Sequence, residues 1–516
     1  MRTLAVRWYG RHGLGSTTVA RVVVIGAGMG GMAVAARLAV KRHRVTVVEQ
    51  SPTYGGKLGT YERDGFVFDT GPSLVTLPAV YRDLFLKTGG ALEDAIDLQD
   101  LEPAFGYRFA DGTTMDMPGV DTARCARAMG EALGGTAEQD WRAYMGRAAD
   151  MWQVTRRPFL EAELTGIRDL LPLARHVSDV RTVAPFTSLR SVASSYLSDP
   201  RLRMLADRYA TYSGSDPRRA PAALATIPYV EQTFGAYHVG GGVRRLADAL
   251  HARTLERGVD YRFESDVTEV ITTSMGVSGV RLADGEVLDA DIVVANADAT
   301  HLYRDLVHDR RGADALRRLR RATPSLSGFV LLLAVRGRTE GLRHHNVWFP
   351  TDYDAEFDAI FGRDAHPVDD PTVYVCAPDD PLMRPDADHE SWFVLVNAPR
   401  HGTNGERGTV DWTASGLAES YRDRVLAVMA ARGFDVRDRL LWSQVRTPAD
   451  LERDTRAPGG AIYGTSSNGA RAAFLRPANR SAVPGLFLVG GSAHPGGGLP
   501  LVGMSADLVA TLIGRA

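Results

Sequence analysis

A glycine-rich segment between a predicted strand and a predicted helix constrains the fold of this chain more than any other feature. Residues 21–25 (RVVVI) form an apolar, β-branched run that is typical of a buried parallel strand. The sequence GAGMGG follows at 26–31 and leads directly into an apolar helical stretch. A second predicted strand, 44–48, ends in Glu49. A G-x-G-x-x-G pattern inside such a strand–helix–strand unit predicts a dinucleotide-binding domain.

The glycines of this pattern have separate physical tasks. Gly26 makes the tight turn, Gly28 lets a pyrophosphate approach the backbone, and Gly31 lets the helix pack closely on the strand. With Gly30 they form the predicted phosphate cradle, where the helix N-terminus offers free N–H groups and a positive dipole end. Glu49 is placed to bind both ribose hydroxyls and to repel a 2′-phosphate. The alternative interpretation is a tight glycine turn in an ordinary α/β protein.

A second glycine pair indicates that the cofactor is a flavin dinucleotide and not a nicotinamide dinucleotide. Residues 51–57 (SPTYGGK) follow Glu49 directly. Gly55 and Gly56 allow a second close approach to the pyrophosphate, and Lys57 offers a positive charge. This segment is similar to the extended FAD fingerprint of glutathione-reductase-like flavoproteins, where arginine is more usual than lysine. A lysine gives a point charge instead of a bidentate fork. The alternative is a surface turn with a solvated lysine.

Composition excludes several other classes of protein. The formal net charge of −2 predicts no nucleic-acid partner. Cys125 and Cys376 are the only cysteines, which rules out a disulfide framework, and no His/Cys/carboxylate cluster has metal-ligand spacing, so no metal is predicted. Apolar runs fall well short of the ~20 residues that a spanning helix needs. Residues 1–20 lack the apolar stretch of a signal peptide, and we interpret them as a disordered leader.

The last 35 residues contain the most specific pattern. A predicted strand ends at Gly490 and Gly491, and the loop 492–500 (SAHPGGGLP) is suited to wrapping a planar ring. A final helix opens around Val502 and Met504, and its N-terminus would face the anionic end of a reduced flavin. His494, in the loop, is the one weak catalytic candidate; we favour a structural role for it. Val267 lies where two-domain flavoproteins usually touch the adenine.

The chain over 21–516 resembles the bacterial and fungal phytoene desaturases, or carotenoid desaturases. The resemblance rests on the glycine motifs above, on FDTGP at 68–72, on APGGAIYG at 457–464 and on the His494 loop. It implies an α/β, glutathione-reductase-like fold: an FAD-binding Rossmann domain, a mixed-sheet substrate domain and a helical cap. We assign 21–120, 237–300 and 466–516 to the FAD-binding domain, 121–236 to a cap that is a candidate for membrane contact, and 301–465 to the substrate domain.

The implied function is FAD-dependent desaturation of an acyclic carotenoid, a hydrophobic polyene. The run PLVGMS at 500–505 departs from phytoene desaturases proper and looks more like the 1-hydroxycarotenoid 3,4-desaturases. The resemblance also implies a cytoplasmic protein, peripheral on the inner face of the cell membrane; oligomeric state stays open. Two further readings are another flavin oxidase of the amine oxidase type and a prenyl-binding protein of the same fold that uses no flavin. Glu49 and the complete C-terminal glycine loop argue against the latter.

Overall fold

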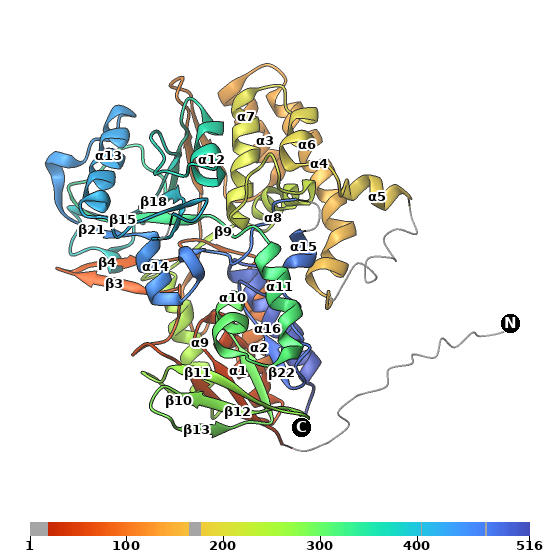
Figure 1. Cartoon of the computed structure of the whole chain (residues 1–516). Helices are drawn as coiled ribbons and strands as arrows, with labels where there is room; N and C mark the ends of the chain where they lie inside the picture. The colour runs from red at the N-terminus through yellow and green to blue at the C-terminus, as the bar shows by residue number, and fades with distance from the viewer. Residues whose placement is uncertain (1–18, 165–176, 404, 470–471) are drawn as a thin grey trace.

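A computed structural model describes residues 19–164, 177–403, 405–469 and 472–516. Residues 1–18 of the predicted leader and 165–176 of the predicted cap lie outside these ranges. Figure 1 shows a lower part that contains both α1 and the C-terminal α16, and an upper part in which a large sheet lies beside a group of helices. The chain passes between the lower and upper parts several times.

A parallel five-stranded sheet is the centre of the lower part. Its strand order is β10-β2-β1-β14-β22, and each neighbouring pair is parallel. The strands are β1 (Arg21–Ile25), β2 (Arg44–Val48), β10 (Asp260–Arg262), β14 (Ile292–Ala295) and β22 (Leu486–Leu488). The dinucleotide domain is therefore assembled from three separate stretches of chain, because β14 and β22 add to the edge of the first βαβ unit.

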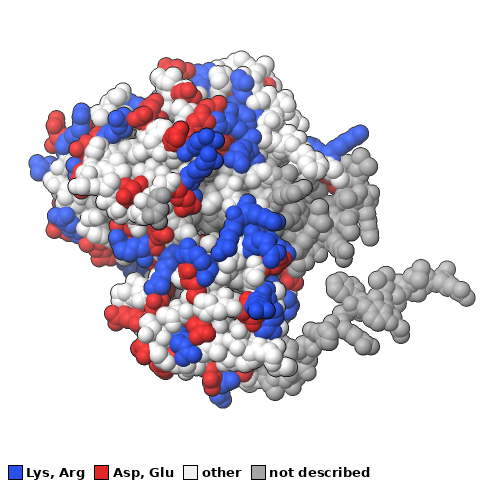
Figure 2. All heavy atoms as spheres, in the orientation of Figure 1, with Lys and Arg blue, Asp and Glu red and all other residues white. Residues whose placement is uncertain are grey.

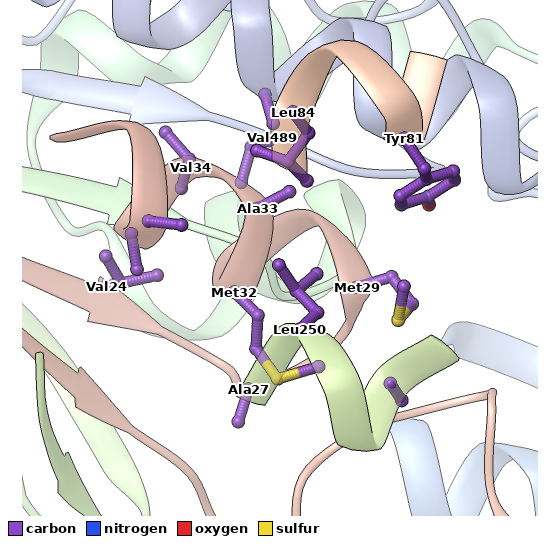
Figure 3. Close-up of a cluster of buried hydrophobic side chains, with 14 of the residues drawn as sticks. Val24, Ala27, Met29, Met32, Ala33, Val34, Tyr81, Leu84, Leu250 and Val489 are labelled. Carbon is purple, nitrogen blue, oxygen red and sulfur yellow. The ribbon is translucent and has the colours of Figure 1, made fainter. Parts of the chain in front are cut away.

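Both faces of this sheet are covered. Alternation along β1 sends Val22 and Val24 into one hydrophobic cluster and Val23 and Ile25 into another. The first cluster contains α1 (Met29–Val40), α9 (Arg244–Glu256) and α16 (Leu499–Ile513), and Figure 3 shows Met32 and Leu250 close together within it. The second cluster is closed by the antiparallel sheet β11 (Val267–Thr273), β12 (Gly276–Leu282) and β13 (Val287–Asp289). Burial on both faces explains the continuous apolar run of β1.

A seven-stranded mixed sheet forms most of the region predicted as the substrate domain, in the order β21-β15-β18-β17-β16-β7-β8. The strands are β7 (Phe105–Arg108), β8 (Thr114–Met117), β15 (Ser327–Arg336), β16 (His345–Trp348), β17 (Val373–Cys376), β18 (His389–Ala398) and β21 (Leu440–Arg446). Here the structure differs from the predicted range 21–120 for the first FAD-binding segment. Residues of β7 pair in parallel with β16, for example Gly106 with Asn346, so β7 and β8 belong to the substrate sheet. No local signal marks this pairing, because the partners are 240 residues apart.

Smaller elements connect these layers. The short strands are β3 (Thr60–Arg63), β4 (Phe66–Asp69), β5 (Val75–Thr76), β6 (Leu98–Asp100), β9 (Ala236–Val239), β19 (Arg400–His401) and β20 (Thr409–Val410). The remaining helices outside the cap are α2 (Ala79–Thr88), α10 (Ala299–His301), α11 (Ala313–Arg321), α12 (Tyr353–Phe361), α13 (Leu417–Ala431), α14 (Pro448–Thr455) and α15 (Ala472–Leu475).

The predicted helical cap is present over its described residues. Its helices are α3 (Thr122–Leu133), α4 (Ala137–Thr155), α5 (Val177–Val183), α6 (Leu189–Tyr196), α7 (Pro200–Arg208) and α8 (Thr226–Phe234). The sequence predicts α4 at 136–156, with an apolar stripe that is either core or the wall of a tunnel. Trp141, Tyr144, Met145 and Ala148 lie in the core of the cap, whereas Trp152, near the end of the helix, lines a cavity. The apolar stripe of α4 therefore contributes both to the core of the cap and to the wall of the cavity.

The visible surface carries both signs of charge. Figure 2 shows arginine and lysine interspersed with acidic side chains, with a concentration of basic groups over the region where Figure 1 places α11. Asp314 on α11 pairs with both Arg317 and Arg318. Among the described residues, none of the helices has the length and apolar character needed to span a bilayer.

Candidate functional site

One large cavity, of about 760 Å³, joins the glycine motifs to an apolar chamber beneath the cap. The predicted site residues that line it are Gly26, Gly28, Gly30, Glu49, Gly55, Gly56, Lys57, Val267, Gly491, His494 and Val502. They come from both ends of the chain and from β11. Gly31, Gly490 and Met504 do not line the cavity; Gly31 and Gly490 lie directly behind it and shape its wall.

The two glycine loops contact each other. The backbone N–H of Gly55 donates to the carbonyl of Ala27 at 2.8 Å, and Gly55 forms a β-bridge with Gly28. Gly26 has φ +96°, a left-handed conformation that favours glycine, as expected for its tight turn. A Cβ on Gly31 would lie 2.1 Å from the carbonyl oxygen of Gly26. The steric reason for Gly31 is therefore contact of α1 with the turn itself.

Asn296 shapes the cradle and was not predicted from the sequence. It follows β14, and its Nδ2 donates to the carbonyl of Val489 at 3.0 Å. A Cβ on Gly28 would lie 2.7 Å from Asn296 Oδ1, and a Cβ on Gly490 would lie 2.3 Å from its Nδ2. The amide of Asn296 thus occupies the space between the first glycine loop and the turn at Gly490. The only sequence signal for this role of Asn296 is its position at the end of an apolar run, VVAN.

The cradle has the groups that FAD requires. No side chain caps the N-terminus of α1 at Gly28, so the first N–H groups of the helix are left for the phosphates of the dinucleotide. Glu49 is buried, and its two oxygens accept from Ala27 N at 2.7 Å and Ser51 N at 2.9 Å. Because a carboxylate oxygen accepts more than one hydrogen bond, both can also bind ribose hydroxyls. These residues fit FAD, and when bound it supplies the hydride acceptor.

Lys57 has a more specific environment than a solvated turn. Its Nζ donates to the carbonyl of Ile462 at 2.6 Å and to that of Ala461 at 3.2 Å. Burial lowers the pKa of the Lys57 ammonium, and the nearby Asp298 opposes this shift. The contacts tie the second glycine loop to the segment 457–464. Its predicted contact with the phosphates stays a prediction.

The C-terminal loop is fixed from two sides. The final helix, α16, begins at Leu499, three residues before the predicted start, because Pro500 is compatible with the first turn. Its N-cap, Gly498, is also without a side-chain cap, and Gly498 to Val502 all line the cavity. Arg476 donates to the carbonyl oxygens of Gly491, Tyr463 and Thr465, at 2.6, 3.0 and 2.5 Å. A helix N-terminus thus faces the cavity at the place expected for the flavin ring.

His494 is held within this loop. Its Nε2 is 3.0 Å from the carbonyl of Ala162 in the cap, and its own carbonyl accepts from Asn479 Nδ2 at 2.8 Å and Ser505 Oγ at 2.8 Å. Burial lowers the pKa of the imidazole to about 4. At neutral pH His494 is therefore an uncharged N–H donor that joins the flavin loop to the cap.

This environment predicts a pH dependence. The folded pKa of His494 is below the unfolded value, so its contribution is complete above pH ~6.5 and is lost as the pH falls towards 4. Relative to His494→Gln, the wild type should lose up to ~1.4 kcal/mol per pH unit across that window. Melting curves of the flavin-loaded proteins between pH 4.5 and 8 measure the difference. Parallel curves for the two proteins would contradict the structural role.

The far part of the cavity is mainly apolar. It is bounded by the cap and by one face of the seven-stranded sheet, with side chains such as Trp152, Ile227, Val230, Val330 and Phe393. Neither the cap nor the sheet could be placed against the flavin loop from sequence spacing. A mainly apolar chamber of this kind suits a hydrophobic ligand.

A hydrogen-bonded network extends from the cavity wall into the seven-stranded sheet. Ser73 and Tyr374 line the cavity, and their hydroxyls are 2.7 Å apart; Tyr374 is also 2.7 Å from Nδ1 of His345. The ligand atoms of His344, His345 and Cys376 lie within 4.8 Å of one another. Cys376 is distant from the two histidines in the sequence, but strand pairing places it opposite His345 on the neighbouring strand β17. Burial strongly lowers the pKa of His345 and lowers that of His344 to about 3.

Fold and cradle together define an FAD-dependent oxidoreductase. Residues 29–387 match the family described as flavin containing amine oxidoreductase, and the chain belongs to this family. A hydroxyneurosporene desaturase of Rubrivivax gelatinosus is 35% identical, over 95% of this chain and 92% of its own length. A 4,4′-diapolycopene oxygenase of Methylomonas sp. is 32% identical, over 95% and 97%. Within the family, the chain therefore groups with carotenoid-modifying enzymes.

A solved structure confirms the fold. Wild-type putrescine oxidase bound to putrescine superimposes with a TM-score of 0.63, at 15% identity, over 96% of this chain and 98% of that chain. The predicted α/β fold with an FAD-binding domain, a mixed-sheet domain and a helical cap is correct.

Proposed function

We propose that this protein is an FAD-dependent desaturase of an acyclic carotenoid. The observation that carries the proposal is the continuity of the cavity: the glycine cradle and the apolar chamber form one space of about 760 Å³. A polyene in the chamber can therefore reach a flavin in the cradle without leaving the protein. Relatives named as carotenoid enzymes, which cover almost the whole chain, support the same substrate class.

Desaturation depends more on how the protein positions the substrate than on reactive side chains. Desaturation removes one hydrogen as hydride, which bound FAD accepts, and one as a proton. The chain has to hold the target C–C bond close to the flavin and to exclude water. Trp152 and Phe393 line the chamber from the cap and the sheet, respectively. Because a methylene is worth only ~1–3 kcal/mol of discrimination, the length of the carotenoid is a weak basis for selection.

Carotenoid profiles of producing cells test the proposal. Expression in hosts that accumulate phytoene, a partly desaturated acyclic carotenoid or its hydroxylated derivative should give a new carotenoid with one or more extra conjugated double bonds in at least one host. Chromatography with absorption spectra detects the change. Gly31→Ala, which should not retain FAD, serves as the inactive control. A flavin-loaded protein that adds no double bond in any of these hosts would refute the desaturase.

We also propose peripheral attachment to the cytoplasmic face of the membrane, where carotenoids dissolve. Support comes from the outer edge of the cap, where α5 lies in Figure 1. Phe186 is 90% exposed and Val180 39% exposed, with Arg181 next to Val180 in sequence. Exposed apolar side chains beside arginine suit an anionic bilayer surface. Fractionation of the same cells should place the yellow protein in the membrane pellet and release it with salt and mild detergent.

A further inference from the structure

Arg208, at the C-terminal end of α7, is a buried cation on the wall of the cavity. Its side chain lines the cavity, and the residue is only 7% exposed. The guanidinium carbon lies 5.2 Å from the ring centre of Tyr212 and 5.8 Å from that of Tyr374, so the group is sandwiched between cap and sheet. A charge in such a place is costly unless hydrogen bonds or an opposite charge compensate it.

The hydrogen bonds of Arg208 are incomplete. Within the described part of the chain, its guanidinium makes one side-chain hydrogen bond, from Nη1 to the hydroxyl of Tyr212 at 3.0 Å, and no salt bridge. A guanidinium has five N–H donors. Two other cations that line this cavity differ: Arg476 donates to three backbone carbonyls and Lys57 to two. Those two are structural ties, whereas Arg208 keeps donors for a molecule in the cavity.

The surroundings hold Arg208 in a fixed position. The Tyr212 hydroxyl, which accepts from Arg208, donates to Glu231 Oε2 at 3.2 Å. Tyr209 donates to the other oxygen of the same carboxylate at 2.6 Å. Glu231 is 5% exposed and lies on α8. A buried carboxylate thus balances the charge through a shared hydroxyl without occupying the donors that remain.

A pure hydrocarbon has no use for these donors, since it would leave them unpaired when it displaces water. An oxygen on the substrate would pair with them, and a hydrogen bond to a charged group is among the stronger ones in proteins. We propose that Arg208 is a specificity-determining residue that binds a hydroxyl or carbonyl oxygen on the polyene, so that the enzyme prefers oxygenated acyclic carotenoids. This inference rests on the proposed function and deepens it.

The test compares two carotenoids of equal conjugated length, one with a terminal hydroxyl group and one without, presented in liposomes to the flavin-loaded enzyme. The wild type should favour the hydroxylated substrate in kcat/KM by about ten- to hundred-fold. Arg208→Met should reduce this ratio to near one, and Arg208→Lys should retain part of it because it keeps a charge but not the planar fork. Arg203→Met is the matched control on the same helix. It is half-buried, does not line the cavity, and should keep the wild-type ratio.

A binding measurement separates this proposal from the proposed function. Equilibrium binding of the same two carotenoids, followed by quenching of tryptophan fluorescence, requires no turnover. Loss of the preference for the hydroxylated compound in Arg208→Met supports the role of Arg208 even if neither compound is desaturated, an outcome that would refute only the desaturase. Equal binding of both compounds by the wild type, or an unchanged ratio in Arg208→Met with full flavin content, would overturn the proposal.

Discussion

Replacing Gly31 by alanine is expected to deprive the protein of FAD and to destabilise it strongly. A Cβ at this position would lie 2.1 Å from the carbonyl oxygen of Gly26 and 3.2 Å from Oδ1 of Asn296. The nearest obstacle is backbone within the tight turn, which cannot rotate away as a side chain can. Relief requires α1 to move from the turn, and this movement takes the helix N-terminus away from the phosphate cradle. Overpacking typically costs ~1–3 kcal/mol, and we expect this site to reach the upper end of that range or exceed it.

The measurement is the ratio of flavin to protein absorbance after gel filtration, together with the melting temperature. Flavin content should fall at least ten-fold. Gly146→Ala is the matched control, because Gly146 lies within α4 and a Cβ there meets nothing within 4 Å. Alanine also favours a helix by up to ~1 kcal/mol over glycine, so this control should melt at the wild-type temperature or higher. Equal flavin content in both variants would show that the turn yields more easily than the geometry indicates.

The local parts of the fold were predictable because their causes are local. The apolar run of β1 and the glycines after it define a strand, a turn and a helix within 20 residues, and the structure has them at Arg21–Ile25 and Met29–Val40. The C-terminal glycine loop was predictable for the same reason. The helix after this loop begins at Leu499, three residues before the predicted start, because proline is favoured in the first turn of a helix.

Long-range relations were not predictable in the same way. Asn296 fills the space between Gly28 and Gly490, yet the sequence shows only an asparagine after an apolar strand. Arg208 appears in the sequence as one of many arginines in the cap, and several of the others form ion pairs in the structure. Its distinguishing features, burial against Tyr374 and a single hydrogen bond, exist only once α7 packs over the sheet. Chemistry that depends on two distant elements requires the structure.

Arg476→Met is expected to separate the flavin loop from the segment that supports it. The guanidinium is the donor to three carbonyl oxygens, those of Tyr463, Thr465 and Gly491, which belong to two different loops on the cavity wall. Burial lowers the pKa of Arg476 to about 10, so it is still charged at neutral pH. Methionine fills a similar volume but donates nothing, and each buried group left unpaired costs ~1–3 kcal/mol. The loss should therefore amount to several kcal/mol and should raise the Kd for FAD at least ten-fold.

Titration of the apoprotein with FAD, followed by flavin fluorescence, measures this Kd. Arg476→Lys should be intermediate, since an ammonium keeps the charge but cannot reach three carbonyls with a planar fork. Arg437→Met is the control, because Arg437 is exposed and pairs with exposed Asp435, and such surface pairs contribute little. A wild-type Kd in Arg476→Met would mean that the loops hold their positions without the arginine. Weak FAD binding in Arg476→Met, combined with a normal Kd in Arg437→Met, would show that the Arg476 side chain stabilises the flavin loop.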